Sequence, residues 1–209
     1  MPKQVRRDAI VGAILQGIQK AQREYKKWSG GDWLWEAPEY LITVYVAEAI
    51  ASIEGPKYVT IERSTKATMD DAGAITKGRI SKKARPSGRV DIVVWWKNGS
   101  PRGVIEIKNQ VRSYSQIAKD VERIDKMLHK NHRGSSFQFG CVAFYTSART
   151  DRKGEARKKL IDCFSLIQSK VEEGICDVIT SSFHNSTIYK VGDSAWSGGC
   201  LLLNKKGKT

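Results

Sequence analysis

The chain has 209 residues, 40% of them hydrophobic and 28% charged, which predicts one folded domain over residues 1–209 with a sizeable core. No stretch approaches the roughly 20 apolar residues of a membrane span, and no cleavage site follows the N-terminal segment, so we expect neither a membrane protein nor a secreted one. Lys and Arg total 36 against 22 Asp and Glu, a net charge of +14. This excess predicts a polyanionic partner, nucleic acid ahead of an anionic membrane or an acidic protein, although a basic protein without such a ligand is the alternative.

The four cysteines stand far apart and form no CxxC pair. This usage is typical of a reduced, cytoplasmic protein and indicates neither a disulfide framework nor a zinc site. The chain also lacks the glycine-rich phosphate-binding loops of ATPases and dinucleotide-binding proteins, so we expect no nucleotide cofactor.

The first part of the chain predicts two helices and a strand. In residues 4–28 apolar side chains recur at helical spacing, and the glycines that follow end the pattern. A second helix is predicted to begin near Pro38, a favourable first-turn residue, and to continue to Gly55. Residues 57–64 are rich in β-branched and aromatic side chains and predict a strand.

Residues 64–89 differ from their surroundings, with seven Lys and Arg against two Asp, and Gly and Pro throughout. They predict a long, mobile basic loop, and loops of this length are commonly functional. Together with a second basic stretch after residue 148, they are expected to follow the phosphates of a nucleic acid, although a solvated charged face is the alternative. The residues predicted to contact nucleic acid are Lys77, Arg79, Lys82, Lys83, Arg85, Arg89, Arg149, Arg152 and Lys153.

The remainder alternates strands and helices. Strands are predicted at 89–96, 102–111 and 137–147, helices at 113–128 and about 153–173, and short strands near the C-terminus. A hairpin followed by a crossover helix predicts an α/β fold in which helices flank a mixed central sheet. The first helix and the C-terminal elaboration at 150–209 are expected to add to this core.

The predicted hairpin aligns two carboxylates. A tight turn centred on Asn98-Gly99 sets Asp91 opposite Glu106, with Cβ atoms about 4.5–5.5 Å apart. A loop longer by one residue on each side sets Asp91 against Lys108 instead. In both registers Asp91, Glu106 and Lys108 share one face, because side chains alternate along a strand. A one-residue bulge would break this inference.

Two opposed carboxylates between apolar neighbours repel each other and are costly to bury. A cation between them resolves the conflict, and two carboxylates with water and phosphate oxygens suit Mg²⁺, with Mn²⁺ as a substitute. Lys108 on the same face could orient an attacking water, help to deprotonate it or stabilise charge on phosphorus. The alternative is a half-exposed hairpin with a cross-strand ion pair between Asp91 and Lys108.

The segments GRVDIVV and VIEIK, separated by a turn, resemble the core signature of the PD-(D/E)xK nuclease superfamily. That superfamily has a restriction-endonuclease-like αβββαβ core, and residues 38–147, about half of the chain, follow the same order. The resemblance implies that Asp91 and Glu106 hold the metal and that Lys108 serves the attack. The Pro of the motif is absent, and Val90 stands before Asp91.

Many members of the superfamily also place a Glu on the helix before the first strand. Glu39 is the best match for this further metal-binding and catalytic residue, ahead of Glu36 and Glu48; its alternative role is a first-turn carboxylate favoured by the helix dipole. Gln110, expected on the same face as Lys108, resembles a polar residue that some members place after the motif.

Charge and resemblance together predict a magnesium-dependent DNA endonuclease, and cutting both strands of a duplex would favour a homodimer. One alternative is a catalytically inactive nucleic-acid-binding protein with the same fold, and another is a module that binds anionic membranes or proteins. Trp28, Trp33 and Trp35 are expected in the core or an interface in preference to a base-stacking role.

Overall fold

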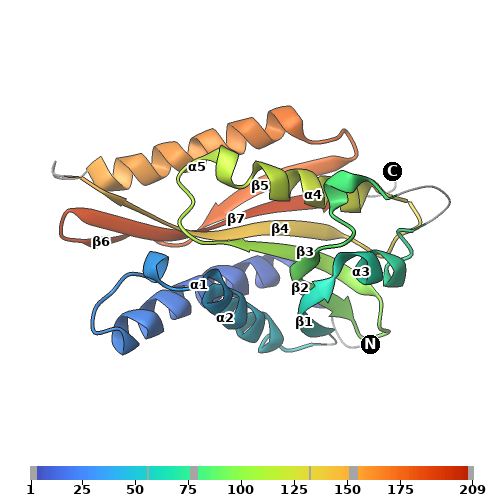
Figure 1. The fold of residues 1–209 in the computed structure, drawn as a ribbon, viewed down its shortest axis with the longest axis horizontal. Helices are drawn as coiled ribbons and strands as arrows, with labels where there is room; N and C mark the ends of the chain where they lie inside the picture. The colour runs from blue at the N-terminus through green and yellow to red at the C-terminus, as the bar shows by residue number, and fades with distance from the viewer. Residues whose placement is uncertain (1–3, 56, 76–79, 132, 151–154, 207–209) are drawn as a thin grey trace.

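A computed structural model describes residues 4–55, 57–75, 80–131, 133–150 and 155–206 of the chain. Within these residues, one mixed sheet has the strand order β1-β2-β3-β4-β7-β5, and the short β6 pairs with one end of β7 (Figure 1). Only β3 and β4 run parallel; the other neighbours are antiparallel. The strands are β1 (Lys57–Ser64), β2 (Arg89–Trp96), β3 (Pro101–Lys108), β4 (Phe139–Arg149), β5 (Ile179–Asn185), β6 (Tyr189–Val191) and β7 (Ser194–Lys205).

Helices cover both faces of the sheet. In Figure 1 α1 (Arg7–Trp28) and α2 (Glu39–Ala51) lie below the sheet, and α4 (Ala118–His129) and α5 (Glu155–Gly174) lie above it. The shorter helices are α3 (Thr65–Asp71) and the 3₁₀ turns η1 (Leu34–Glu36), η2 (Lys82–Ala84) and η3 (Tyr114–Gln116).

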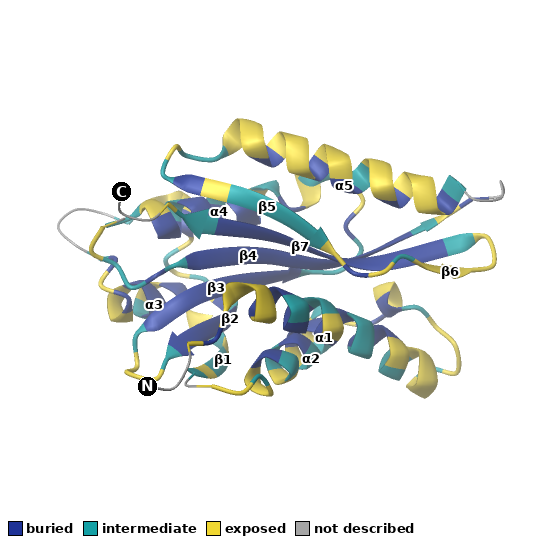
Figure 2. Ribbon diagram, turned by 180° about the vertical axis from the view of Figure 1, so that it is seen from behind, coloured by how far each residue is buried: buried dark blue, intermediate teal, exposed yellow. Residues whose placement is uncertain are grey.

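Each face of the sheet has its own apolar core, and the central strands β3, β4 and β7 are almost entirely buried between them (Figure 2). On one face Ile14 and Val46 pack with Ile105, and on the other Ile124 and Phe164 pack with the Val142 side of β4. An α/β fold with a mixed sheet flanked by helices is therefore confirmed. The helix α4 makes the crossover that parallel neighbours β3 and β4 require.

The helices α1 and α2 approach each other closely at Gly17. A Cβ on Gly17 would lie 2.7 Å from the Val46 Cα and 2.8 Å from the Tyr45 carbonyl oxygen, so no larger side chain fits there without displacing a backbone. Since α2 begins at Glu39, this contact helps to fix the position of that carboxylate over the sheet.

The second helix is shorter than predicted. It ends at Ala51, and Ser52 begins the turn, where its hydroxyl donates to the Glu48 carbonyl at 2.9 Å. The Lys57 ammonium donates to the carbonyls of Ala51 and Ile53, so a side chain from β1 satisfies acceptors at the helix end.

The prediction of one long mobile loop over 64–89 is wrong for much of that segment. Ser64 caps α3, whose Met69 is completely buried, and Ala84 of η2 is buried as well. These small and apolar side chains pack into the core beneath α4, which outweighs the high charge of their neighbours.

The C-terminal segment contributes more than an added edge. Over eleven residues β7 pairs with β4, and it lies between β4 and β5 with both faces covered. Among the described residues, none of the helices is both long enough and apolar enough to cross a membrane.

Candidate active site

The hairpin has the predicted register, but its turn and its strand β3 differ from the predicted ones. The turn has three residues, because the Trp96 N–H donates to the Ser100 carbonyl and Gly99 takes a φ of +86°. This shifts the pairing by one residue, and an irregularity in β3 between Pro101 and Gly103 shifts it back. Beyond that bulge, Ile92 pairs with Ile105, so the register puts Asp91 opposite Glu106 as expected.

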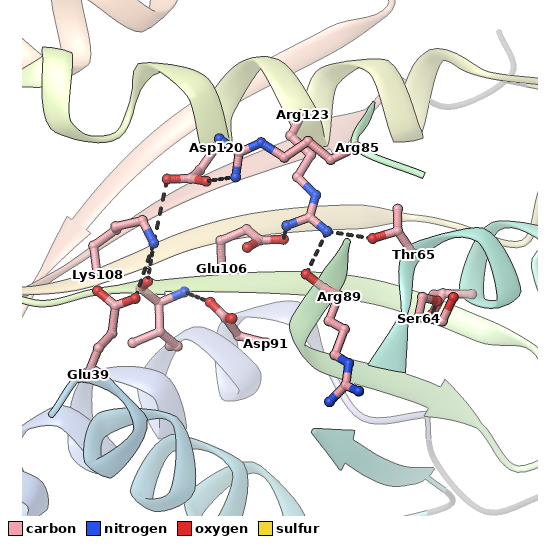
Figure 3. A network of polar contacts seen from close by, with 12 residues as sticks. Glu39, Ser64, Thr65, Arg85, Arg89, Asp91, Glu106, Lys108, Asp120 and Arg123 are labelled. Carbon is pink, nitrogen blue, oxygen red and sulfur yellow. Dashed lines mark hydrogen bonds and ion pairs between the residues drawn. The ribbon is translucent and has the colours of Figure 1, made fainter. Parts of the chain in front are cut away.

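Asp91 lies where the ladder between β2 and β3 ends. Its Oδ2 accepts a hydrogen bond from the Ile107 backbone N–H at 2.6 Å, so the carboxylate replaces the missing strand carbonyl (Figure 3). Burial raises the pKa of Asp91; the Ile107 N–H and the Lys108 ammonium oppose this effect, and the Glu39 and Glu62 carboxylates add to it.

Glu62 is an acidic neighbour that the sequence reasoning did not consider. The pairing of Ile61 with Ile92 and of Arg63 with Val90 sets Glu62 across from Asp91 on β1. Its φ of +51° lies in the left-handed region, which is unusual for a glutamate inside a strand.

Glu106 is almost completely buried and meets a buried arginine from α4. Arg123 Nη1 lies 2.8 Å from Glu106 Oε1, and both side chains are 3% exposed. The contact lacks hydrogen-bond geometry, because Oε1 has no hydrogen-bond partner among the described residues. Burial raises the pKa of Glu106 to about 8, since desolvation outweighs the attraction of Arg123, and the Asp91 and Asp120 carboxylates add to the rise.

Arg123 is itself held from two sides. Its Nη2 donates to the Arg89 carbonyl at 2.6 Å and to the Thr65 hydroxyl (Figure 3). These contacts tie α4 to the start of β2 and to α3, so the segment predicted as a loop supports the wall of the site.

Lys108 projects from the end of β3 toward carboxylates on both sides of the sheet. Its Nζ donates to Glu39 Oε1 at 3.2 Å and to its neighbour's carbonyl, that of Ile107, at 3.0 Å, and it lies 3.8 Å from Asp120 Oδ2. Burial lowers the pKa of Lys108, but the attraction of Asp120 and Glu39 outweighs it, and the net pKa is raised. Lys108 is therefore a firmly protonated cation in this arrangement.

Glu39 reaches the site from the first turn of α2, the position predicted for it. Its second oxygen accepts from the Asn109 N–H at 2.9 Å, so the carboxylate bridges two consecutive residues at the end of β3. The Asn109 amide in turn donates to the carbonyls of Leu34 and Ala37, at 2.9 and 3.0 Å, which fixes the segment leading into α2.

The sequence reasoning missed Asp120 and Arg123, which face the site from α4. Both are buried, and Asp120 contacts Arg85 at 3.4 Å as well as Lys108. A signal for them was present, because Asp120 and Arg123 stand three and six residues after Ile117 and so lie beside the apolar stripe of the helix.

Gln110 is placed away from the carboxylates. Strand β3 ends at Lys108 and Gln110 has a φ of +54°, so the alternation used to place it no longer applies. Its side-chain amide contacts the Ser147 hydroxyl and carbonyl. With the amide group rotated by 180°, which gives both of its atoms suitable partners, its oxygen accepts from Arg112 Nε at 2.9 Å and Nη2 at 2.8 Å.

The basic residues predicted to bind nucleic acid fall into three groups. Lys83 and Arg85 form ion pairs with Glu122 and Asp120 on α4, which reduces their availability for phosphate. Lys82, Arg89 and Arg149 are exposed. Lys77, Arg79, Arg152 and Lys153 lie outside the described residues.

The donor set of the site fits a hard divalent cation. Asp91 uses only one oxygen in hydrogen bonding among the described contacts, and Glu106 Oε1 is a buried acceptor that has no hydrogen bond but lies 2.8 Å from Arg123 Nη1. Within the described residues no three His, Cys, Asp or Glu side chains form a ready ligand group. Two carboxylates are nevertheless sufficient for Mg²⁺, which keeps several waters and commonly shares substrate phosphates.

Comparison of the chain with protein-family models, curated proteins and solved structures found no match. Its function is accordingly inferred from the site itself.

Proposed function

We propose that this protein is a magnesium-dependent DNA endonuclease with a restriction-endonuclease-like core. The observation that carries the proposal is the convergence of Asp91, Glu106 and Lys108 from a hairpin with Glu39 from the first turn of α2. The order α2, β1, β2, β3, α4 and β4 supports the core assignment, with α3 inserted between β1 and β2.

Asp91 and Glu106 would hold the cation, with Glu39 as a further ligand or as the anchor of Lys108. When bound, Mg²⁺ or Mn²⁺ would supply a polarised scissile phosphate and a more acidic water. Lys108, protonated and held between Glu39 and Asp120, is suited to donate hydrogen bonds and to stabilise negative charge on a phosphate. Its raised pKa favours this role over that of a base that deprotonates water.

DNA is the proposed substrate because a net charge of +14 supplies phosphate affinity, and the resemblance favours DNA over RNA. A homodimer would bring the two sites that a double-strand cut needs. A binding protein without catalysis is the second candidate, and the contact between Glu106 and Arg123 favours it, because a guanidinium already lies against one of the proposed metal ligands.

The test compares the wild-type chain with Asp91→Asn and Lys108→Ala on supercoiled, linear, single-stranded and branched DNA in Mg²⁺, Mn²⁺ or EDTA. Cleavage by the wild type that is lost in EDTA and in both variants supports the nuclease. Salt-sensitive DNA binding with no cleavage under any of these conditions would overturn the nuclease proposal and support the binding protein.

A further inference from the structure

A cavity of about 620 Å³ lies next to the proposed active site, between the segment that contains η1, the end of β4 and α5. This volume is in the range that holds a nucleotide-sized ligand. Its walls include two tryptophans, three cationic side chains and a buried serine. These residues are Trp33, Trp35, Arg112, Ser147, Arg149 and Lys159.

The two tryptophans form an aromatic wall. The rings of Trp33 and Trp35 are stacked, with centroids 5.0 Å apart and an interplanar angle of 23°. Trp35 is 37% exposed, whereas Trp33 is partly buried and packs against the core. A partly exposed, stacked indole offers a surface on which a nucleobase can stack, whatever the base.

The remaining walls suit a phosphate and the polar edge of a base. Arg112, Arg149 and Lys159 carry positive charge, and no Asp or Glu is among the described residues that line the cavity. Thr146, also in the wall, has a buried hydroxyl with no hydrogen-bond partner among the described residues. The combination of an aromatic face, cations and an unsatisfied hydroxyl matches a nucleoside phosphate.

The cavity opens at this point because β4 extends beyond β3. Lys108 is the last residue of β3 and pairs with Phe144, and the Val111 N–H donates to the Tyr145 carbonyl just beyond it. From Thr146 onward, no strand among the described residues pairs with that edge of β4 on the β3 side, and the cavity occupies this position.

Short contacts connect the cavity to the residues after Lys108. Gln110 contacts Ser147 in the cavity wall, and Asn109 binds the Leu34 carbonyl within η1. Contacts with the segments that form the cavity wall thus begin one or two residues after Lys108, so a DNA strand that left the active site along the end of β3 would pass the cavity.

We propose that this cavity binds one unpaired nucleotide of the DNA substrate, with its base against Trp35 and its phosphate near Arg112 and Lys159. The assignment of DNA as the ligand rests on the proposed function. It narrows the substrate class to DNA with an unpaired end or single-stranded segment, because a base within a duplex is already stacked on both sides and costs free energy to extrude.

The experiment measures binding by the Asp91→Asn chain, which keeps an acceptor for the Ile107 N–H. Two duplexes with equal numbers of phosphates are compared, one blunt and one with a three-nucleotide overhang. We expect the overhang to bind about tenfold more tightly, and Trp35→Ala to remove this preference without changing blunt-end affinity. Trp28→Ala is the matched control, since Trp28 is 58% exposed and lies outside the cavity wall.

A second pair of variants tests the charge. Lys159→Gln should lower the affinity for the overhang duplex several-fold. Lys158 is an exposed neighbour outside the cavity wall, so Lys158→Gln should lower the affinity for both duplexes equally. Equal affinity for the two duplexes, or a preference that survives Trp35→Ala and Lys159→Gln, would overturn the proposal. So would micromolar binding of deoxythymidine monophosphate by a chain that shows no overhang preference, because the ligand would then be a free nucleotide.

These outcomes are separate from the test of the nuclease. Binding is measured in a variant that need not cut, so cleavage by the wild type with no overhang preference rejects the cavity assignment alone. An overhang preference in a chain that never cuts rejects the nuclease and leaves a single-strand-binding cavity.

Discussion

Arg123 Nη1 lies 2.8 Å from Glu106 Oε1 in the interior, so a helix on one side of the sheet places a cation against the carboxyl group that the hairpin presents. The pair joins α4 to β3, and further bonds from Arg123 reach Thr65 and the Arg89 carbonyl. The wall of the site is therefore part of the buried core rather than a surface loop.

Removing the arginine alone should destabilise the chain. Above about pH 8, where Glu106 is ionised, Arg123→Met leaves a buried carboxylate without its partner, which typically costs about 3–5 kcal/mol. The double variant Arg123→Met with Glu106→Gln should regain part of this loss, because no charge is then left unpaired. Urea unfolding measures both, and a change of less than about 1 kcal/mol in Arg123→Met would contradict the buried pairing.

The raised pKa of Glu106 predicts a pH-dependent stability in EDTA. Because this carboxyl titrates at about 8 in the folded chain against an ordinary value of 4.5, the folded state binds more protons between these values. The free energy of unfolding should therefore fall as pH rises from 5 to 8, and the raised pKa of Asp91 acts in the same direction.

Glu106→Gln should flatten this pH profile in urea unfolding measured at unit steps. Glu54→Gln, at an exposed position, should leave the slope unchanged. An identical slope in wild type and Glu106→Gln would show that burial does not perturb this carboxyl.

The bridge from Glu39 to Lys108 and Asn109 predicts a selective loss of catalysis. Glu39→Gln keeps one acceptor but not both, so Lys108 loses its fixed position, and we expect the cleavage rate to fall about 100-fold. DNA binding should stay within about twofold of the wild type, as the net charge becomes more positive. Glu48→Gln, on the same helix as Glu39, breaks a surface ion pair with Lys20 of α1 and should leave the cleavage rate unchanged; an equal loss in both variants would refute the bridge.

The close approach of α1 and α2 predicts opposite effects at two glycines of one helix. Gly17→Ala forces the helices apart and should cost about 1–3 kcal/mol. Gly12→Ala meets nothing within 4 Å and should stabilise the chain by about 0.5–1 kcal/mol through higher helix propensity. Thermal unfolding of the two variants checks both signs, and a stabilised Gly17→Ala chain would count against the packing of α1 on α2.

The sequence allowed the hairpin to be predicted, but not the way in which it forms. The register predicted from a tight turn at Asn98-Gly99 correctly placed Asp91 opposite Glu106, although the turn has three residues and β3 carries a compensating bulge. Neither irregularity has a signal in the sequence, since each depends on how the two strands twist against their neighbours. The predicted register was thus right because the extra residue in the turn and the extra residue in β3 offset each other.

Tertiary packing explains what the sequence did not reveal. The apolar stripe of α4 was recognised, but whether Asp120 and Arg123 at its border face water or protein depends on how much of the helix is covered. The place of β7 between β4 and β5 also depends on long-range pairing, which a list of elements in chain order does not contain.

The side chain of Asn109 joins two distant parts of the chain, because it donates to the carbonyls of Leu34 and Ala37, which lie 75 and 72 residues before it. These hydrogen bonds tie the segment that carries the tryptophan pair and leads into Glu39 to the end of β3. We therefore expect a ligand that displaces the indoles to shift Lys108 as well, so that binding in the cavity and the position of the Lys108 ammonium are coupled.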